Sequence, residues 1–204
     1  MTKISSEVRS KLHLVLRRVR IAYPNVFEPK LNSLSKKEEY STQIRFYEDN
    51  AAHMGVVKQI KEAMREAAEA YWGQAAEKFM REALDSKNTR GLRYDEEGGY
   101  FYINAKRRAD QGAPRVVGRN PKMVLTAADG KVYSGAVVNA VVDVWCYSGT
   151  AKNGAKIPPG FSFTLCGIQF VEDGDPLGGT SAAKDADWEQ LENEDEEPDF
   201  TDIP

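Results

Sequence analysis

Basic and aromatic side chains that could contact a nucleic acid recur along the first 150 residues of this 204-residue chain. Lysine and arginine neutralise phosphates, and flat rings stack on bases that are exposed only in an unpaired strand. The candidate phosphate contacts are Arg18, Arg20, Arg45, Lys106, Arg107, Arg108, Arg115 and Arg119. The candidate stacking rings are Tyr23, Tyr47, Tyr100, Tyr102, Trp145 and Tyr147. A solvated charge or a core ring explains any one of them equally well, so it is the set that favours a groove for single-stranded nucleic acid.

Alternation along two predicted strands puts rings and charges on the same outer faces. In residues 135–147 an apolar face alternates with a polar face that carries Trp145 and Tyr147. In residues 100–106 the pattern directs Tyr100 and Tyr102 outward, and it directs inward Phe101, Ile103 and Ala105. Packing of the two tyrosines under a long helix is the alternative.

The chain lacks a pattern typical of a catalytic centre. His13 and His53 have no local metal-ligand spacing, so surface or packed roles are expected for both. Asp143 is the only acid inside a strand-like core segment, and a salt bridge or hydrogen bond beside the sheet is expected. The glycine pairs match neither phosphate-binding motif. We predict no catalytic residue, no metal and no cofactor, and the weaker alternative is a metal-dependent nuclease that uses Glu172, Asp173 and Asp175.

The elements that would position these side chains are strands with one long helix between them. The expected strands are 12–16 with 19–21 (ending at Tyr23-Pro24), 40–47, 99–105, 123–126, 135–147 and 161–171, joined by loops at 109–120 and 148–160. From about Ala51 to Leu84 apolar residues recur at helical spacing, with Asn50 as the expected N-cap and Gly73 as a possible break. Around five strands and one long helix suit a small, mainly β, α+β domain or a partly open barrel.

The net charge of −3 is the sum of two opposed blocks. Residues 172–204 hold thirteen acidic residues and one basic residue, a net charge of −12. Residues 1–171 hold 27 basic and 18 acidic residues, a net charge of +9. The composition after residue 177 is too polar to repay the entropy of ordering, so we predict a disordered acidic tail over 178–204. The body is expected to be basic enough for a nucleic-acid partner.

The sequence contains few signals that indicate where in a cell the protein is located. The N-terminus lacks an apolar run before a cleavage site, and no apolar run approaches the ~20 residues of a membrane span. Two separated cysteines, Cys146 and Cys166, fit a reducing compartment rather than a disulfide scaffold. We expect a location in a reducing cytoplasm and no membrane partner.

Three segments carry a resemblance to a known family. Residues 132–147 (VYSGAVVNAVVDVWCY) and residues 160–179 (GFSFTLCGIQFVEDGDPLGG) resemble a family of bacteriophage single-stranded DNA-binding proteins. Residues 19–29 (VRIAYPNVFEP) look like the first-strand signature of the same family. The resemblance implies an OB-fold-like, five-stranded, partly open barrel over 1–177, with an inserted helix near 51–84 and an acidic tail.

The chain terminus has its own pattern, in which apolar residues stand among acids. Such residues suit a docking peptide whose hydrophobe inserts while its charges steer it to a basic partner. The ending Asp202-Ile-Pro204 is also similar to the Asp-Asp-Ile-Pro-Phe tip of bacterial single-stranded DNA-binding proteins, although the final Phe is missing. The expected docking residues are Asp199, Phe200, Asp202 and Ile203.

The resemblance implies sequence-independent binding of single-stranded DNA during phage replication and recombination, and the basic and aromatic residues agree with such a ligand. The tail is expected to compete with DNA for the groove and to recruit replication and recombination proteins. The alternative is a non-catalytic adaptor or structural phage protein that binds other proteins. A monomer and a dimer are both compatible with the sequence.

Overall fold

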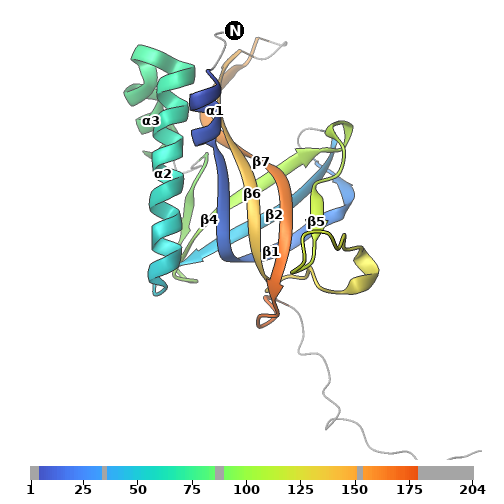
Figure 1. The fold of residues 1–204 in the computed structure, drawn as a ribbon. Coiled ribbons are helices and arrows are strands. Elements are labelled where there is room, and N and C mark those ends of the chain that lie inside the picture. The colour runs from blue at the N-terminus through green and yellow to red at the C-terminus, as the bar shows by residue number, and fades with distance from the viewer. Residues whose placement is uncertain (1–4, 34–35, 86–89, 151–153, 179–204) are drawn as a thin grey trace, which may run out of the picture.

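The computed structural model describes residues 5–33, 36–85, 90–150 and 154–178 (Figure 1). Its strands are β1 (His13–Leu31), β2 (Glu38–Tyr47), β3 (Arg93–Asp95), β4 (Tyr100–Arg108), β5 (Arg115–Val117), β6 (Val137–Thr150) and β7 (Lys156–Glu172). Its α-helices are α1 (Ser6–Leu12), α2 (Ala51–Trp72) and α3 (Ala76–Asp85). Short 3-10 turns lie at Gly73–Ala75, Ala109–Gln111 and Ala127–Asp129.

Five of these strands form a barrel. β2 pairs with both β1 and β4, and β6 pairs with both β1 and β7, all antiparallel. A parallel pairing of β4 with β7, at Ala105↔Phe163 and Lys106↔Thr164, closes the sheet on itself. β3 and β5 add three residues each, at the side of β4 and of β7. The predicted OB-like barrel is confirmed, and its closure over two residue pairs in the described chain matches a partly open barrel.

Alternate side chains of the strands point into the barrel and form its core. Thr42, Ile44 and Phe46 of β2 are buried while their neighbours are half-exposed. On β6 the buried residues are Val138, Ala140, Val142 and Val144, as their spacing predicts. Burial of one strand face against a common core is what holds a register, because a shift of one residue would expose that whole face.

The predicted long helix is two helices. Asn50 caps α2, its side chain accepting from the backbone N–H of Ala52 and of His53 at 3.0 and 3.2 Å. Gly73 ends α2 with a φ of +51°, a conformation that glycine adopts readily. The N-cap and the break at Gly73 are therefore both confirmed. His53 is packed, as expected, because the Tyr47 backbone N–H donates to its Nδ1 while its Nε2 lies 3.1 Å from the Arg18 carbonyl.

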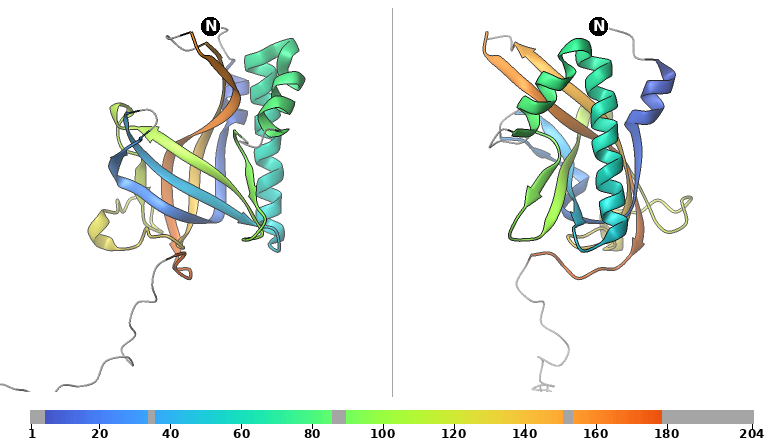
Figure 2. Two further views of the ribbon diagram at one scale, coloured as in Figure 1. Left: turned by 180° about the vertical axis from the view of Figure 1, so that it is seen from behind. Right: turned by 90° about the vertical axis from the view of Figure 1, so that its left-hand side faces the viewer.

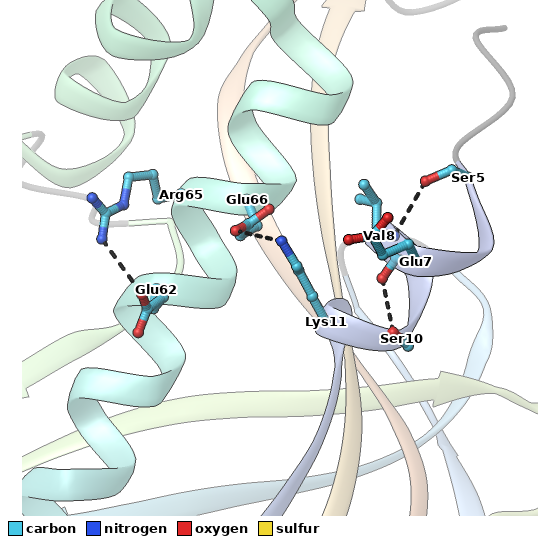
Figure 3. A network of polar contacts seen from close by, with 8 residues as sticks. All are labelled: Ser5, Glu7, Val8, Ser10, Lys11, Glu62, Arg65 and Glu66. Atoms are coloured by element: carbon cyan, nitrogen blue, oxygen red, sulfur yellow. Dashed lines mark hydrogen bonds and ion pairs between the residues drawn. The ribbon is translucent and has the colours of Figure 1, made fainter.

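Helix α1 was not predicted and is tied to α2. The Ser5 side chain caps it by accepting from the Val8 N–H, and Lys11 forms an ion pair with Glu66 of α2 at 3.1 Å (Figure 3). Leu12 at its last turn is buried in the core. Residues 12–16 were expected to be strand throughout, so the helical turn at Leu12 corrects that boundary.

Other strand boundaries also differ from prediction. β1 does not end at Tyr23-Pro24: a register shift between Ala22 and Asn25 carries the strand past the proline, which has no N–H to donate. Of the predicted strand at 123–126 only Val124 forms a bridge, to Val117. β3 and β5 were missed, and β6 and β7 extend into the segment expected to be a loop at 148–160. Among the described residues, none of the helices is long and apolar enough to cross a membrane.

Candidate nucleic-acid interface

Six of the predicted contact residues lie together on the outer face of β1, β2 and β4. Register places Arg20 opposite Arg45, Arg45 opposite Tyr102, and Tyr47 opposite Tyr100, and directly opposed residues project on the same side of a sheet. Figure 2 (left) shows β2 and β4 side by side on this part of the barrel. We call the cation–ring cluster the set Arg20, Tyr23, Arg45, Tyr47, Tyr100 and Tyr102.

Arginine over tyrosine is the repeated contact in the cluster. The Arg45 Cζ lies 4.4 Å from the Tyr100 ring centroid and 5.7 Å from that of Tyr23, and Arg20 lies 5.7 Å from that of Tyr47. The ring centroids of Tyr47 and Tyr100 are 5.5 Å apart. Contacts of this kind hold charge and ring in place before a ligand arrives.

The rings of the cluster differ in what they offer a base. Tyr23 is 64% exposed, and its φ of +52° is uncommon for a residue with a side chain. Tyr100 is only 9% exposed, and its ring packs over Gly98, where a Cβ would lie 2.0 Å from the ring. Burial raises the pKa of Tyr100; the neighbouring Arg45 charge opposes this rise, and a hydrogen bond to Asp95 adds to it. Tyr23 is thus the ring best placed to stack on a base, and Tyr100 supports Arg45 from below.

The alternative placement of Tyr100 and Tyr102 under the long helix is wrong. Both belong to the outer cluster, where their ring centroids are 6.0 Å apart. The ring that faces α2 is Phe101, with the Lys61 Nζ 5.3 Å from its centroid. Strand alternation alone accounts for this, because Phe101 is the inward residue of the strand start.

The eight predicted phosphate contacts divide by what holds them. Three form ion pairs with carboxylates: Arg18 with Glu172 at 2.5 Å, Lys106 with Glu39 at 3.5 Å, and Arg108 with Asp110 at 2.6 Å. Five donate to neutral oxygens. Arg45 donates to the Gln43 amide oxygen, and the other four donate to backbone carbonyls, namely Arg20 to Gly135 and Asp175, Arg107 to Gln111 and Gly112, Arg115 to Pro121, and Arg119 to Val171. A neutral acceptor orients a guanidinium without cancelling its charge, so these five retain more attraction for phosphate.

Trp145 and Tyr147 are not part of the cluster. Trp145 is 41% exposed and meets Tyr71, near the end of α2, at a centroid distance of 5.8 Å, whereas Tyr47 meets His53 in the first turn. Eighteen residues of helix separate Tyr71 from His53, or about 27 Å at 1.5 Å per residue. Tyr147 packs over Gly160, where a Cβ would lie 2.4 Å from its hydroxyl. The structure therefore divides the predicted rings into two groups at opposite ends of α2.

Arg18 and Arg119 also stand apart from the cluster. They line a hollow of about 380 Å³ on the side of β1, β6 and β7, together with Asn139, Gln169 and Glu172. The Arg18 backbone N–H donates to the Asn139 side chain, which donates to that of Gln169, and Arg18 has its φ at +51°. The hollow is a second polar site, whose charge is partly neutralised by Glu172.

His13, Asp143 and Cys166 lie together on β1, β6 and β7. The His13 Nδ1 lies 2.6 Å from Asp143, as the expected salt bridge or hydrogen bond, and the Cys166 thiol donates to the other oxygen of Asp143 at 3.3 Å. These three residues are also the group in the described chain whose ligand atoms, within 4.8 Å of one another, could hold a metal ion. Burial, and then the Asp143 charge, raises the pKa of Cys166 to about 11. The thiol is therefore protonated at neutral pH, which disfavours it as a ligand.

The sequence of the chain matches that of a known family. The model of the family described as the Enterobacter phage Enc34 ssDNA-binding protein matches residues 12–201 of this chain. The chain belongs to that family. A curated relative, putative protein p50 of Acyrthosiphon pisum secondary endosymbiont phage 1, is 29% identical over 193 residues, or 91% of this chain and 97% of p50.

Solved structures show the same fold. The single-stranded DNA-binding protein of bacteriophage Enc34, in complex with ssDNA, has a TM-score of 0.63 at 17% identity, and covers 87% of this chain and 97% of its own. The protein gp2.5, a single-stranded DNA-binding protein encoded by bacteriophage T7, has a TM-score of 0.51 at 12% identity, covering 94% and 98%. In OB folds the face of the second and third barrel strands, here β2 and β4, is the usual oligonucleotide site. The cation–ring cluster lies on that face.

The end of the described chain is held beside the cluster. The Leu177 N–H donates to the Ser134 carbonyl at 2.8 Å, and the Tyr133 hydroxyl donates to the Gly174 carbonyl at 2.8 Å. Arg20 of the cluster donates to the carbonyl of Asp175. We call residues 173–178 the anchored segment. The predicted docking residues Asp199, Phe200, Asp202 and Ile203 lie outside the described residues.

Sequence reasoning missed one residue of this face. Arg93 of β3 stands opposite Tyr102 and so extends the row of Arg20, Arg45 and Tyr102 to a fourth strand. β3 is three residues long, too short for an alternation pattern to reveal. The only signal in the sequence is the adjacency of a cation and a ring at Arg93-Tyr94.

Proposed function

We propose that this protein binds single-stranded DNA without regard to sequence, on the outer face of β1, β2 and β4, during phage DNA replication and recombination. The cation–ring cluster carries the proposal, because it brings two arginines oriented by neutral acceptors against four tyrosines on the usual ligand face of an OB barrel. Membership in the Enc34 ssDNA-binding family, and the similar fold of the Enc34 protein in complex with ssDNA, support this ligand.

The chemistry of the cluster suits a strand rather than a duplex. Phosphates would be met by Arg20 and Arg45, and an unstacked base would lie on Tyr23, whose ring is exposed. A ring accepts any base, since every base has a π-face, and stacking contributes roughly 1–3 kcal/mol per base. A duplex keeps its bases stacked inside and offers only the phosphates.

A fluorescence and salt titration tests this proposal. Oligo-dT is added to the protein at several salt concentrations, and binding is followed by fluorescence anisotropy of the labelled oligonucleotide. We expect tight binding at low salt, a log–log salt slope of roughly −0.7 per phosphate contacted, and similar affinity for oligo-dC. Weaker binding to a duplex of the same length is also expected. No binding to single strands at low salt would contradict the proposal.

The acidic tail is the second part of the proposed function. We infer that it competes with DNA for the cation–ring cluster and that it recruits replication or recombination proteins once DNA displaces it. The anchored segment supports competition, because the chain continues toward the tail from a point where Arg20 already contacts Asp175. Residues 178–204 hold ten acidic residues and one basic residue, which give the tail the negative charge needed to replace phosphates.

A further inference from the structure

Three side chains with metal-binding chemistry meet on the outer face of β1, β6 and β7, which lie side by side (Figure 1). The ligand atoms of His13, Asp143 and Cys166 all lie within 4.8 Å of one another. His13 and Asp143 are 130 residues apart in the chain, and Asp143 and Cys166 are 23 apart, so the sequence shows no local ligand spacing. Strand pairing brings the three together, and the DNA binding proposed above does not use them.

The backbone directs these three side chains to one point. His13 stands opposite Asp143 in the register of β1 and β6, and directly opposed residues project on the same side of a sheet. Leu165 and Gly167 of β7 pair with consecutive residues of β6, so Cys166 between them is an extra residue that forms a bulge. A bulge re-aims the side chain that it carries. The Cys166 thiol accordingly points to Asp143, to which it donates at 3.3 Å.

The three donor atoms suit zinc. An imidazole nitrogen, a carboxylate oxygen and a thiolate sulfur are ligands of protein zinc sites, with bonds of about 2.0–2.3 Å that place neighbouring ligand atoms about 3.4–3.6 Å apart in a tetrahedron. The His13 Nδ1 is 2.6 Å from the Asp143 Oδ1, and the Cys166 Sγ is 3.3 Å from the Asp143 Oδ2. A shift of about 1 Å in the His13 side chain, which is 51% exposed, would therefore admit the ion.

A zinc ion would replace the protons that now lie between these groups. A carboxylate only accepts hydrogen bonds, so the His13 Nδ1 and the Cys166 thiol each carry a proton toward Asp143. When zinc binds, the thiol proton passes to water, and a neutral imidazole exchanges its Nδ1 proton for one on Nε2. The Asp143 charge is, after burial, a cause of the raised pKa of Cys166, and the two positive charges of zinc offset that carboxylate. A thiol that coordinates zinc is deprotonated outright.

We propose that His13, Asp143 and Cys166 form a zinc-binding site in which water completes the four ligands. A hollow of about 630 Å³, lined also by residues of α1, opens onto His13 and Asp143 and gives the ion a path from solvent. The site joins the start of β1 to β6 and β7, so zinc bound to the native chain should stabilise it. Seven residues of β1, or about 23 Å, separate His13 from Arg20 of the cation–ring cluster. The zinc site therefore does not depend on the proposed function.

Cobalt substitution on the full chain tests the site, because Co²⁺ bound to a thiolate gives a charge-transfer absorption in the near ultraviolet that carboxylates do not give. We expect this band to grow to one Co²⁺ per chain and to disappear when Zn²⁺ is added. Cys166→Ser should abolish the band, and His13→Gln should lower the Co²⁺ affinity at least about 10-fold. Cys146→Ser removes the other free thiol and is the matched control, which should leave the band and the affinity unchanged.

Thermal unfolding gives a second measurement that does not depend on cobalt. Zn²⁺ should raise the Tm of the unsubstituted chain and of Cys146→Ser, because an ion that binds only the native state stabilises it. Zn²⁺ should leave the Tm of Cys166→Ser in place. A Tm of Cys166→Ser that rises with Zn²⁺ as much as that of the unsubstituted chain would contradict the proposal.

The remaining outcomes also decide the proposal. Cobalt binding without the charge-transfer band would place the ion on carboxylates alone, and a band that survives Cys166→Ser would place it on another thiol; either result overturns the site. One ion per two chains would mean that a second copy supplies ligands, which contradicts a site within one chain. Oligo-dT affinity should be the same with and without Zn²⁺, so failure of the zinc site leaves the DNA site standing, and the reverse holds as well.

Discussion

At the scale of single residues, the candidate site depends on how each cation and ring is held. Arg45 touches two rings and a neutral amide, so its charge is both fixed and retained. Arg108 has the same side chain but is bound by two oxygens of Asp110. The sequence identified both arginines as candidate phosphate contacts. It could not predict which of them keeps its charge available, because the ion pair of Arg108 with Asp110 is visible only in the side-chain geometry.

Tyr23 should contribute the most to stacking. Tyr23→Ala is expected to weaken oligo-dT binding by roughly 1–3 kcal/mol, because its ring is the most exposed in the cluster and a stacked base loses its partner. Tyr23→Phe keeps the ring and should bind like the unsubstituted protein. The two affinities are measured by anisotropy at one salt concentration, and equal affinity for Tyr23→Ala would remove this ring from the site.

Arg45 and Arg108 should differ in their effect on salt dependence. Arg45→Gln is expected to lower affinity and to reduce the log–log salt slope by about 0.7, the value for one phosphate contact on a single strand. Arg108→Gln should leave the slope near its original value, because Asp110 already neutralises that guanidinium. An Arg108 effect as large as that of Arg45 would show that ion pairing inside the protein does not decide which arginines meet phosphate.

At the scale of elements, periodic segments were predictable and short ones were not. The alternation of β2 and β6, the cap at Asn50 and the break at Gly73 follow from residue types within a few positions. β3, β5 and α1 have three to seven residues, and they form because a neighbour already in place supplies their partners. The extension of β1 past Pro24 depends on a register shift that the sequence does not signal.

The close contact between Gly135, just before β6, and Asp175 of the anchored segment can be tested by substitution. Gly135 has a φ of +119°, and a Cβ there would clash with the Asp175 carbonyl oxygen at 2.2 Å. Gly135→Ala is therefore expected to lower the free energy of unfolding by more than about 1 kcal/mol. Gly55→Ala, in the second turn of α2 with open space around it, should raise it by about 0.5–1 kcal/mol. Urea denaturation of both variants checks the pair, and a neutral Gly135→Ala would show that the segment is not held as described.

At the scale of the whole molecule, the separation of charge between body and tail is the feature most directly predictable from the sequence. A body of +9 and a terminal stretch of −12 follow from counting alone. Counting charges could not show the path of the chain after the last strand. In the structure the chain passes beside Arg20, which donates to the Asp175 carbonyl, and so approaches the cation–ring cluster. Counting could not group the rings either, because Tyr47 and Trp145 come to lie at opposite ends of α2 only in the folded barrel.

Deletion of the tail should reveal the competition. A chain lacking residues 185–204 is expected to bind oligo-dT more tightly than the full chain, chiefly at low salt, because unscreened carboxylates compete best with phosphate. The difference should shrink as salt rises. Affinities of the two chains are compared by anisotropy over a salt series, and equal values at every salt would exclude competition by the tail.

The position of the DNA is the central claim, and a crystal structure of the protein with a short oligo-dT tests it most directly. We predict a strand that crosses the outer face of β1, β2 and β4, with a base on Tyr23 and phosphates at Arg20 and Arg45. A strand that lies instead on Trp145 and Tyr71, or in the hollow of Arg18 and Arg119, without touching the cation–ring cluster would contradict the account.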